Sequence, residues 1–457
     1  MEAITSAVKR HRTFFNTGKT LDVAFRKNSL KKLKSALLRY EEKICDAFWK
    51  DLRKSKFEAF GTEIGIVLKE IGLHSKRLKK WAGPKSVLTD MVNFYSTSRI
   101  YPQPYGVVLI MSPWNYPLQL AMSPLVGAIS AGNCVMLKPA HYSAHVSEVI
   151  RELISETFDP GYISVMTGGR DVNQAMLDER FDYIFFTGSP FLGKIVMEKA
   201  ARHLTPVTLE LGGKSPCIVE PDADIGVAAR RICFGKFLNA GQTCVAPDHV
   251  FVHVDVKAKL IEAMGQCIRR FYGDDPEQSP DFGRIISDEQ FRRLAHLMHS
   301  AGTIIHGGRL NPETRYIEPT LIDGITHDDP IMQEEIFGPL LPILDYQNLD
   351  HVIARINERE KPLALYFFSA SSGARERVLA HTSSGGGCVN DTVMHFSNPR
   401  MPFGGVGNSG MGRYHGKFSF ETFSHHRSIL RKTTLFNPAL AYPPYGNKLR
   451  YIRRLLS

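Results

Sequence analysis

The chain has 457 residues, of which 43% are hydrophobic and 23% are charged. This length suggests two or three domains, and the composition excludes a disordered or fibrous protein. The seven cysteines form no CxxC pair and no cluster with histidine. We therefore expect free thiols in a reducing, cytoplasmic environment, with neither a metal site nor a disulfide scaffold.

The net charge of +11 is concentrated at the two ends of the chain. Residues 1–80 carry 20 Lys and Arg against 9 Asp and Glu, and residues 422–457 carry 7 against none. Neither end contains a motif of a nucleic-acid-binding protein, so we expect no nucleic-acid partner. The N-terminal excess is interpreted as solvated helix faces.

Apolar residues at steps of three, four or seven predict an amphipathic helix over residues 23–52, and a similar pattern covers 58–81. The stretch 100–137 has no charged residue, but its five prolines exclude a continuous membrane-spanning helix. It is interpreted as a buried strand (105–111), a buried helix (117–131) and a second strand (134–137).

Short apolar strands then alternate with helices, which is typical of parallel α/β sheets. A glycine-rich stretch, 398–416, is predicted to be a loop with close backbone approaches. The first series of strands covers 105–111, 134–137, 162–166, 183–186 and 216–219. The second runs from about 248 to 390 and includes 249–254, 302–308, 362–368 and 387–390.

The segment 181–201 predicts a strand, a glycine turn and a helix whose free N–H groups would suit a phosphate. The spacing of Gly188, Gly193 and Lys194 nearly matches a P-loop. That motif then needs Ser or Thr to hold magnesium, and position 195 is Ile. A nucleotide triphosphatase site would therefore lack its metal ligand, whereas a dinucleotide-binding site needs no metal. A purely structural strand–helix turn is the alternative.

Two residues stand out as candidates for catalysis. Cys244 lies in the polar turn GQTCVAP, where exposure and backbone N–H donors would favour the thiolate; most lone cysteines, such as Cys233, are inert core residues instead. Glu210 lies between two leucines before a Gly-Gly turn. Apolar surroundings would raise the pKa of this carboxyl group and suit it to a general base, unless it is an ordinary surface glutamate.

Two weaker signals accompany these candidates. Asn115, in the turn MSPWNYP after a buried strand, is a rigid amide that could stabilise an oxyanion, although Asn in a Pro-rich turn is often structural. Glu334 and Glu335 precede an aromatic residue and a Gly-Pro turn, and a carboxylate there could accept both hydroxyls of a ribose. A solvated acidic turn is the alternative.

Together these five segments, in their order along the chain, resemble the aldehyde dehydrogenase superfamily over residues 20–430, and the class 3 branch most. The resemblance implies two doubly wound (Rossmann-like) α/β domains and a small β oligomerisation arm. Residues 1–81 and 102–208 would form the NAD(P)-binding domain and 209–405 the catalytic domain. The bridging strands would be 82–101 and 425–435, followed by a basic C-terminal tail, 436–457.

The resemblance also implies a mechanism. The Cys244 thiolate would attack the aldehyde, the Cys244 N–H and Asn115 would hold the oxyanion, and the thiohemiacetal would become a thioester. Glu210 would activate the hydrolytic water. The positive nicotinamide would help to activate the thiol. Cofactor-binding roles would fall to Trp114, Lys138, Gly188, Ser189, Gly193, Glu335 and Phe337, and the substrate tunnel to Tyr116 and Phe403.

One position departs from the family pattern. In LKPAHYS, His141 stands where relatives usually carry a Glu that binds the 2′-hydroxyl of NAD and repels the phosphate of NADP. His141 removes that charge and could donate to a phosphate, more strongly if protonated. We therefore expect NADP to be accepted as well as NAD, unless His141 simply points to solvent.

The branch also implies an aldehyde substrate, medium- or long-chain aliphatic or aromatic, and a homodimer. The basic tail is too short to span a membrane but could make weak peripheral contact with an anionic surface. Packing on a partner subunit is the alternative. Competing functions are a CoA-acylating enzyme, which would generally lack Glu210, and a cysteine esterase, which would leave the cofactor residues unexplained. A non-enzymatic scaffold would be expected to lose Cys244, Glu210 or Asn115.

Overall fold

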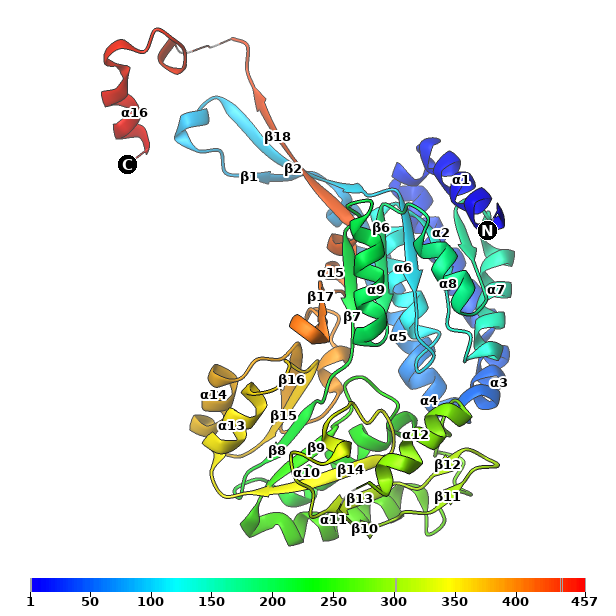
Figure 1. Ribbon diagram of the computed structural model, residues 1–457. Helices are drawn as coiled ribbons and strands as arrows, with labels where there is room; N and C mark the ends of the chain where they lie inside the picture. Colours follow the sequence, from blue (N-terminus) through cyan, green and yellow to red (C-terminus); the bar gives the residue numbers. More distant parts are fainter. Residues whose placement is uncertain (1, 301, 436, 438, 457) are drawn as a thin grey trace.

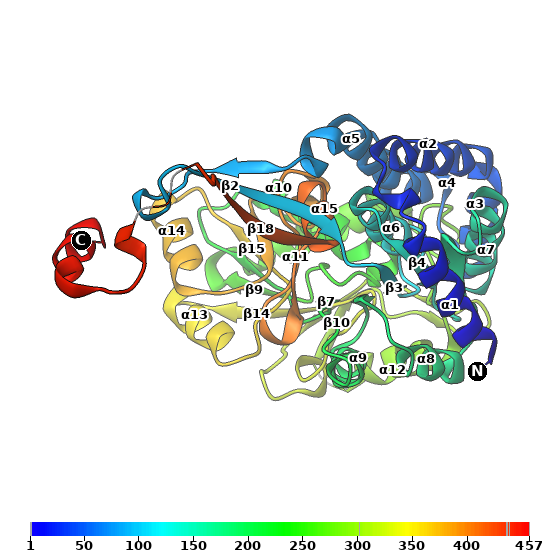
Figure 2. The same cartoon turned by 90° about the horizontal axis from the view of Figure 1, so that it is seen from above.

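The computed structural model describes residues 2–300, 302–435, 437 and 439–456. Residues 436, 438 and 457 of the predicted tail therefore lie outside the described residues. The molecule has a body of two lobes and a thin arm that carries the C-terminal segment away from it (Figure 1). Seen from above, the arm leaves the side opposite to the N-terminal helix α1, Glu2–Asn16 (Figure 2).

The first predicted helix is in fact two helices, α2 (Val23–Arg39) and α3 (Glu41–Leu52). The chain breaks at Tyr40, whose backbone angles (φ −91°, ψ 0°) lie outside the helical region. The Ile44 N–H still donates to the Tyr40 carbonyl oxygen, so the apolar periodicity continues through the break. The sequence pattern alone therefore could not reveal it.

The second predicted helical segment contains a π-helical turn, Phe60–Ile64, between α4 (Lys56–Ala59) and α5 (Gly65–Ala82). Such turns widen a helix locally and are frequent at functional sites.

The N-terminal lobe is built on a six-stranded sheet with the order β17-β7-β6-β3-β4-β5. All neighbours are parallel except β17, which pairs antiparallel with β7. The earliest strand, β3, lies in the middle, and the chain adds strands first on one side and then on the other. This creates a topological switch point between β3 and β6. The strands are β3 (Val107–Met111), β4 (Cys134–Lys138), β5 (Ile163–Val165), β6 (Tyr183–Thr187), β7 (Val207–Glu210) and β17 (Gly410–Met411).

The uncharged stretch of the sequence forms the centre of this lobe. β3 and β4 are buried along their whole length, and so is the helix between them. The predicted order of strand, buried helix and strand is therefore confirmed. The predicted loop 398–416 is mostly irregular, but its Gly410 and Met411 form β17. The helices of this sheet are α6 (Gln119–Ala131), α7 (Ala144–Thr157), α8 (Arg170–Leu177) and α9 (Pro190–Ala201).

The second lobe holds a seven-stranded sheet with the order β10-β13-β14-β9-β8-β15-β16. Only β10 is antiparallel to its neighbour. The predicted strand 216–219 is β8 and belongs to this sheet rather than to the first. The strands are β8 (Pro216–Val219), β9 (His249–His253), β10 (Thr303–His306), β13 (Thr320–Asp323), β14 (Leu340–Tyr346), β15 (Ala364–Phe368) and β16 (Gly386–Val389).

The sequence did not indicate β13 or β14. β14 contains Pro342, a residue that normally argues against a central strand because it lacks an N–H donor. The helices of this lobe are α10 (Ile225–Phe237), α11 (Val254–Tyr272), α12 (Asp288–Met298), α13 (Leu349–Asn357) and α14 (Ser372–His381). A short ribbon of β11 (Leu310–Asn311) and β12 (Tyr316–Ile317) lies at its edge.

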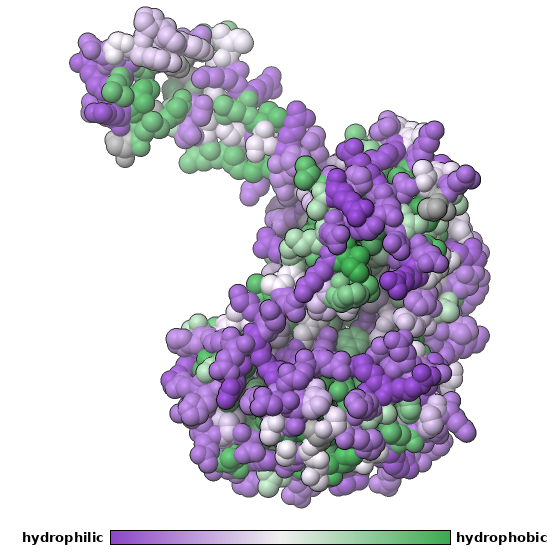
Figure 3. All heavy atoms as spheres, viewed as in Figure 1, coloured by the Kyte–Doolittle hydropathy of each residue, from purple (hydrophilic) through white to green (hydrophobic). Residues whose placement is uncertain are grey.

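The arm is an antiparallel sheet with the order β1-β2-β18. Its strands are β1 (Lys85–Val87), β2 (Ser96–Pro104) and β18 (Ser424–Lys432), reached through α15 (Lys417–Thr422), and α16 (Leu449–Leu456) lies beyond it. Apolar residues gather on its surface (Figure 3), among them Leu88 and Leu435, which are 98% and 95% exposed. Two parallel sheets plus a small antiparallel sheet confirm the predicted fold class. No helix in the described part of the chain is both long and apolar enough to cross a membrane.

Candidate active site

The carboxyl ends of the strands in the first sheet open into a cavity of about 380 Å³. Ligands bind at this edge, near the switch point, in parallel sheets of this kind. Residues from the second lobe close the cavity on its other side. Most of the predicted site residues line it: Trp114, Asn115, Lys138, His141, Gly188, Ser189, Glu210, Cys244, Glu335 and Phe337.

Lys138 and His141 lie at the end of β4 and just beyond it. The buried Lys138 ammonium donates to the carbonyl oxygens of Pro139 and Gly168 at 2.9 and 2.8 Å, and burial lowers its pKa to about 8. His141 is exposed at the cavity edge and packs on Tyr142. Partial burial, followed by the charge of Lys138, lowers the pKa of His141. Near pH 7 its ring is therefore neutral and keeps one N–H donor.

The turn after β6 presents a helix N-terminus to the cavity. The Ser189 hydroxyl caps α9 by accepting the Leu192 N–H, and Pro190 follows as the first helical residue. Gly193, which was expected to face a pyrophosphate, lies instead on the buried side of α9. A Cβ at this position would lie 2.8 Å from Leu211. Gly193 therefore allows the helix to pack closely on the sheet and does not line the cavity.

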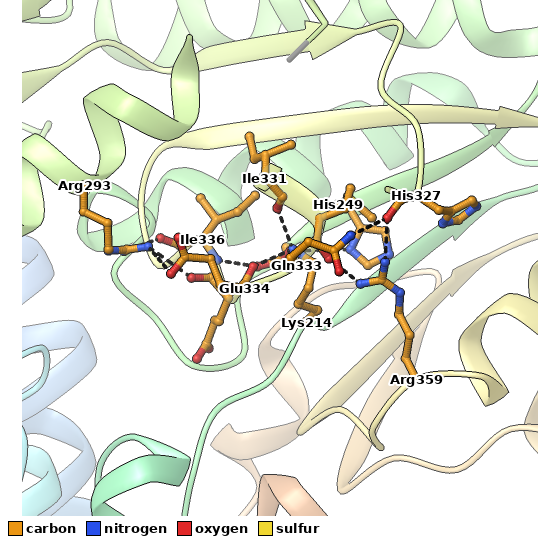
Figure 4. A network of polar contacts seen from close by, with 12 residues as sticks. Lys214, His249, Arg293, His327, Ile331, Gln333, Glu334, Ile336 and Arg359 are labelled. Atoms are coloured by element: carbon orange, nitrogen blue, oxygen red, sulfur yellow. Dashed lines mark hydrogen bonds and ion pairs between the residues drawn. The ribbon is translucent and has the colours of Figure 1, made fainter. Parts of the chain in front are cut away.

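The loop between β13 and β14 is held in place through its main chain (Figure 4). The Lys214 ammonium donates to the carbonyl oxygens of Ile331 and Glu334 at 2.9 and 2.8 Å. The Asp248 carboxylate accepts the Ile336 N–H at 2.9 Å. Arginines clamp the same region from two sides: Arg293 donates to the carbonyls of Glu335 and Ile336, and Arg359 to those of His327 and Met332.

Lys214 and Asp248 also form a buried ion pair at the centre of this clamp. Burial alone would raise the pKa of Asp248, but the Lys214 charge and a hydrogen bond from His249 hold it below its usual range. The carboxylate of Glu335 approaches Gly212 so closely that a Cβ there would lie 2.0 Å from its Oε2. Burial, followed by the charge of Asp248, raises the pKa of Glu335 to about 8.

Trp114 and Phe337 form the aromatic wall of the cavity. Their rings meet edge to face with centroids 5.4 Å apart. Phe337 has a left-handed backbone (φ 51°), which turns the chain directly after Ile336. An aromatic wall of this kind suits a flat ring system.

Cys244 follows a sharply turned segment between α10 and β9. Asn239, Ala240 and Gly241 have φ values of 53°, 52° and 76°, and a Cβ on Gly241 would lie 2.3 Å from the carbonyl oxygen of Gly338. Left-handed non-glycine residues cost free energy and persist only where the surroundings fix them, often at functional sites.

The surroundings of Cys244 do not favour its thiolate, contrary to the prediction from the polar turn. Burial, followed by the charges of Glu335 and Glu210, raises the pKa of the thiol to about 12. The main-chain N–H groups of Cys244 and Val245 oppose this shift but are outweighed. The thiol is therefore protonated at neutral pH. Cys233 is fully buried in α10, as predicted.

Glu210 ends β7 with its carboxyl group in apolar surroundings. It is 2% exposed, and neither of its carboxyl oxygens has a hydrogen-bond partner within the described ranges. Burial raises its pKa well above the usual value, in agreement with the prediction from the flanking leucines. A carboxyl group with free oxygens is available to a water molecule or a substrate group.

Asn115 and Tyr116 connect the turn after β3 to the segment before Cys244. The Asn115 Nδ2 donates to the carbonyl oxygen of Gln242 at 3.0 Å. The Tyr116 hydroxyl and the Thr243 hydroxyl are 2.7 Å apart. Because Nδ2 carries two hydrogens, one remains for a ligand in the cavity that Asn115 and Cys244 both line.

A second, apolar cavity meets the first at Cys244 and Glu210, which line both. Its wall includes Tyr116 and Phe403, the two predicted tunnel residues. It leads to an outer groove of about 770 Å³, with Leu238, Val393 and Phe396 among the residues common to cavity and groove. The predicted cofactor and tunnel residues therefore lie on opposite sides of Cys244.

Several residues of this region were not found by sequence reasoning. Tyr414 and His415, in the predicted glycine-rich loop, line the apolar cavity. Lys214 lies within the motif LELGGKSP and Asp248 directly follows the motif GQTCVAP, so their positions beside the recognised motifs could have indicated them. Lys54 was counted among the solvated basic residues, but its side chain is 1% exposed.

Comparison with known proteins gives the family. The model of the aldehyde dehydrogenase family matches residues 1–429. This chain belongs to the aldehyde dehydrogenase family. It is 53% identical to 4,4'-diaponeurosporen-aldehyde dehydrogenase of Staphylococcus aureus (strain NCTC 8325) over 97% of this chain and 96% of that protein. It is 45% identical to the dimeric NADP-preferring aldehyde dehydrogenase of Rattus norvegicus over 98% and 99% of the two chains.

Among solved structures, this aldehyde dehydrogenase is similar to Staphylococcus aureus AldH in a substrate-bound state. The TM-score is 0.98, with 51% identity over 99% of both chains. The protein is thus an NAD(P)-dependent enzyme that oxidises aldehydes to carboxylic acids, and its resemblance to the class 3 branch is confirmed.

Proposed function

We propose that this enzyme oxidises apolar aldehydes through a covalent thioester on Cys244 that is hydrolysed by water activated by Glu210. The observation that carries the proposal is the position of Cys244 and Glu210 at the junction of two cavities, one polar and one apolar. A substrate in the apolar cavity and a cofactor in the polar one would meet at these two side chains.

The polar cavity fits a nicotinamide dinucleotide. Ser189 and the N-terminus of α9 would hold phosphate, Lys138 and Glu335 would hold the two riboses, and Trp114 and Phe337 would flank the nicotinamide ring. Gly212 and Glu335 are fixed in close approach, so the ribose-binding carboxylate is preorganised. A nicotinamide dinucleotide bound there supplies the hydride acceptor that turns the thiohemiacetal into a thioester.

The residues of this chain perform the other steps. The Cys244 thiol releases its proton to solvent water, which the positive nicotinamide ring of a bound cofactor would favour, and Sγ then attacks the aldehyde carbon. The bond that forms fixes the substrate beside the polar cavity. The free hydrogen on Asn115 Nδ2 and the Cys244 N–H donate to the carbonyl oxygen as it becomes negative. Asn115 is a preorganised donor because hydrogen bonds hold the turn on which it lies.

Glu210 suits the hydrolysis of the thioester. Its buried carboxyl group has a raised pKa and no hydrogen-bond partner among the described residues, so it can take a proton from a water molecule placed between it and the thioester carbon. The acid then leaves and Cys244 is regenerated.

The apolar tunnel supports medium- and long-chain aliphatic or aromatic aldehydes as substrates. Its inner part is lined by residues such as Leu120, Phe396 and Phe403, and the outer groove extends it. Burial of a long apolar tail along this whole path would make the free energy of substrate binding more favourable. The S. aureus relative is named as a dehydrogenase of 4,4'-diaponeurosporen-aldehyde.

His141 supports the use of NADP alongside NAD. It lines the cavity beside Lys138 and carries no negative charge that would repel a 2′-phosphate. The name of the rat relative describes that enzyme as NADP-preferring.

A homodimer is the proposed assembly, because the arm exposes apolar side chains that a second copy would cover. The same rat relative is described as dimeric. Helix α16 exposes Leu449 and Leu456 beside Arg450, Arg453 and Arg454. This combination supports a weak contact of α16 with an anionic membrane surface. The enzyme itself would be cytoplasmic.

The proposal is tested by following absorbance at 340 nm with benzaldehyde, hexanal and decanal, each with NAD and with NADP. Reduction of the cofactor is expected with all three aldehydes. It should be fastest with decanal, because the outer groove would bind the alkyl chain of this substrate. Reduction that requires added coenzyme A would instead indicate an acylating enzyme, and ester cleavage without any reduction would indicate a cysteine esterase.

A further inference from the structure

A buried ion pair lies directly behind the turn that carries Asn115. Lys54 Nζ and Glu63 Oε1 are 2.7 Å apart, and the two side chains are 1% and 0% exposed. Lys54 follows α3, and Glu63 lies in the π-helical turn between α4 and α5. Neither residue lines a cavity at the reacting atoms.

The remaining hydrogen bonds of this pair go to the active-site turn. Glu63 Oε2 accepts the N–H groups of Leu118 and Gln119 at 3.1 and 2.9 Å, which fixes the start of α6. Lys54 Nζ lies 3.4 Å from the carbonyl oxygen of Asn115 and 4.3 Å from the centre of the Tyr116 ring. The pair therefore holds both ends of the turn.

Asn239 joins this turn to the segment before Cys244. Its Nδ2 donates to the carbonyl oxygens of Asn115 and Gln242 at 2.8 and 3.1 Å. The Gln242 carbonyl oxygen also accepts the Asn115 side chain at 3.0 Å. Asn239 is buried in a left-handed conformation (φ 53°).

Stability alone gives little reason for such a cluster. Two charges removed from water lose hydration, and well-packed apolar residues of similar size often replace a buried pair without loss of stability. What an apolar replacement could not supply is the set of directed hydrogen bonds to the main chain of residues 115–119. The cluster is therefore best explained by the geometry that it imposes.

We propose that Asn239, supported by the Lys54–Glu63 pair, is a positioning residue that holds the Asn115 amide toward the carbonyl oxygen of the aldehyde attacked by Cys244. The inference rests on the oxyanion role proposed for Asn115. A shift of about 1 Å in a catalytic group can reduce rate a hundredfold, so loosening of this brace is expected to lower kcat.

The test uses Asn239→Gly in the full chain, because glycine tolerates the left-handed backbone and removes only the amide bridge. Ala240→Gly is the matched control: position 240 has nearly the same φ (52°) but no bridging side chain. The kcat for decanal is expected to fall tenfold to about a hundredfold in Asn239→Gly and less than about twofold in the control. The Kd for NAD, measured by equilibrium titration, should stay unchanged in both.

The decisive readout is a double-mutant cycle with Asn115→Ala. If Asn239 acts through Asn115, Asn239→Gly will add less than about twofold to the loss in Asn115→Ala. Losses that multiply, or an Asn239→Gly enzyme as fast as wild type, would overturn the proposal. If Asn239→Gly does not fold, the cycle is repeated with Asn239→Asp, which keeps the shape of the side chain, and with Lys54→Met. If Asn115→Ala alone keeps full activity, the oxyanion role itself is wrong.

Discussion

The side-chain amide of Asn115 donates a 3.0 Å hydrogen bond to the main-chain carbonyl of Gln242, two residues before Cys244. This bond crosses from the first sheet to the second lobe, so it links the segment of the proposed oxyanion donor directly to the segment of the proposed nucleophile. Small relative motions of the two lobes would otherwise change the distance between them.

Asn115→Ala is expected to lower kcat by about a hundredfold to a thousandfold, the usual loss on removal of one oxyanion donor. The Kd for the cofactor should change little, because the other cavity-lining residues remain. Stopped-flow reduction of NAD with decanal measures kcat, and equilibrium titration measures the Kd. Equal kcat values for the variant and wild type would exclude Asn115 from the oxyanion site.

The raised pKa of Cys244 predicts slow alkylation of the free enzyme. Only the thiolate reacts, and with a pKa of about 12 its fraction rises with pH throughout the accessible range. The rate of iodoacetamide labelling at Cys244, followed by peptide mass spectrometry, should therefore increase up to pH 10 without a plateau. NAD should accelerate labelling at pH 7.5, because its positive nicotinamide ring would stabilise the Cys244 thiolate.

Cys267 provides the internal control for this measurement. It is half-buried in α11, away from both cavities, so NAD should not change its labelling rate. Fast labelling of Cys244 at pH 7.5 without cofactor, levelling off near pH 8, would show that its thiolate is already stabilised in the free enzyme.

His141 predicts a pH-dependent choice of cofactor. Burial and Lys138 lower its pKa, so the ring is neutral at pH 7.5 and gains a proton only as the pH falls through the lowered value. The ratio of kcat/KM for NADP to that for NAD should rise from pH 8 to pH 6. His141→Gln should remove this rise, and His141→Glu should disfavour NADP at every pH. A flat ratio in wild type would indicate that His141 points away from the phosphate.

Gly212 predicts a selective loss of cofactor binding. In Gly212→Ala the new Cβ would lie 2.0 Å from Glu335 Oε2 and would displace the carboxylate. The KM for NAD should rise about tenfold or more, equal to about 1.4 kcal/mol of binding free energy. Gly72→Ala is the control, because nothing lies within 4 Å of a Cβ in that helical position. An unchanged KM in Gly212→Ala would argue against a ribose contact at Glu335.

Local patterns predicted much of the fold. The strands next to Cys244 and Lys138 were found because buried parallel strands appear as short apolar runs. The break at Tyr40 was missed because apolar periodicity continues through it, and β14 was missed because of Pro342. Both failures come from tertiary packing that a local pattern does not contain.

The site was predictable where its residues stand in recognisable turns. Cys244, Glu210 and Glu335 could be found in this way, and the structure brings them to one cavity. The raised pKa of Cys244 could not be predicted, because it arises first from burial in the folded protein and then from carboxylates 34 residues before it and 91 after it along the chain. The buried position of Gly193 could not be predicted either, because its close approach to Leu211 depends on how α9 packs on the sheet.

The covalent mechanism is tested most directly with Glu210→Gln. This variant should still form the thioester but hydrolyse it about a hundredfold to ten-thousandfold more slowly. Mixed rapidly with NAD and decanal, it should release a burst of about one NADH per active site, and mass spectrometry should find a decanoyl group on Cys244. Steady turnover at the wild-type rate, or a burst without any acyl group on Cys244, would contradict the account.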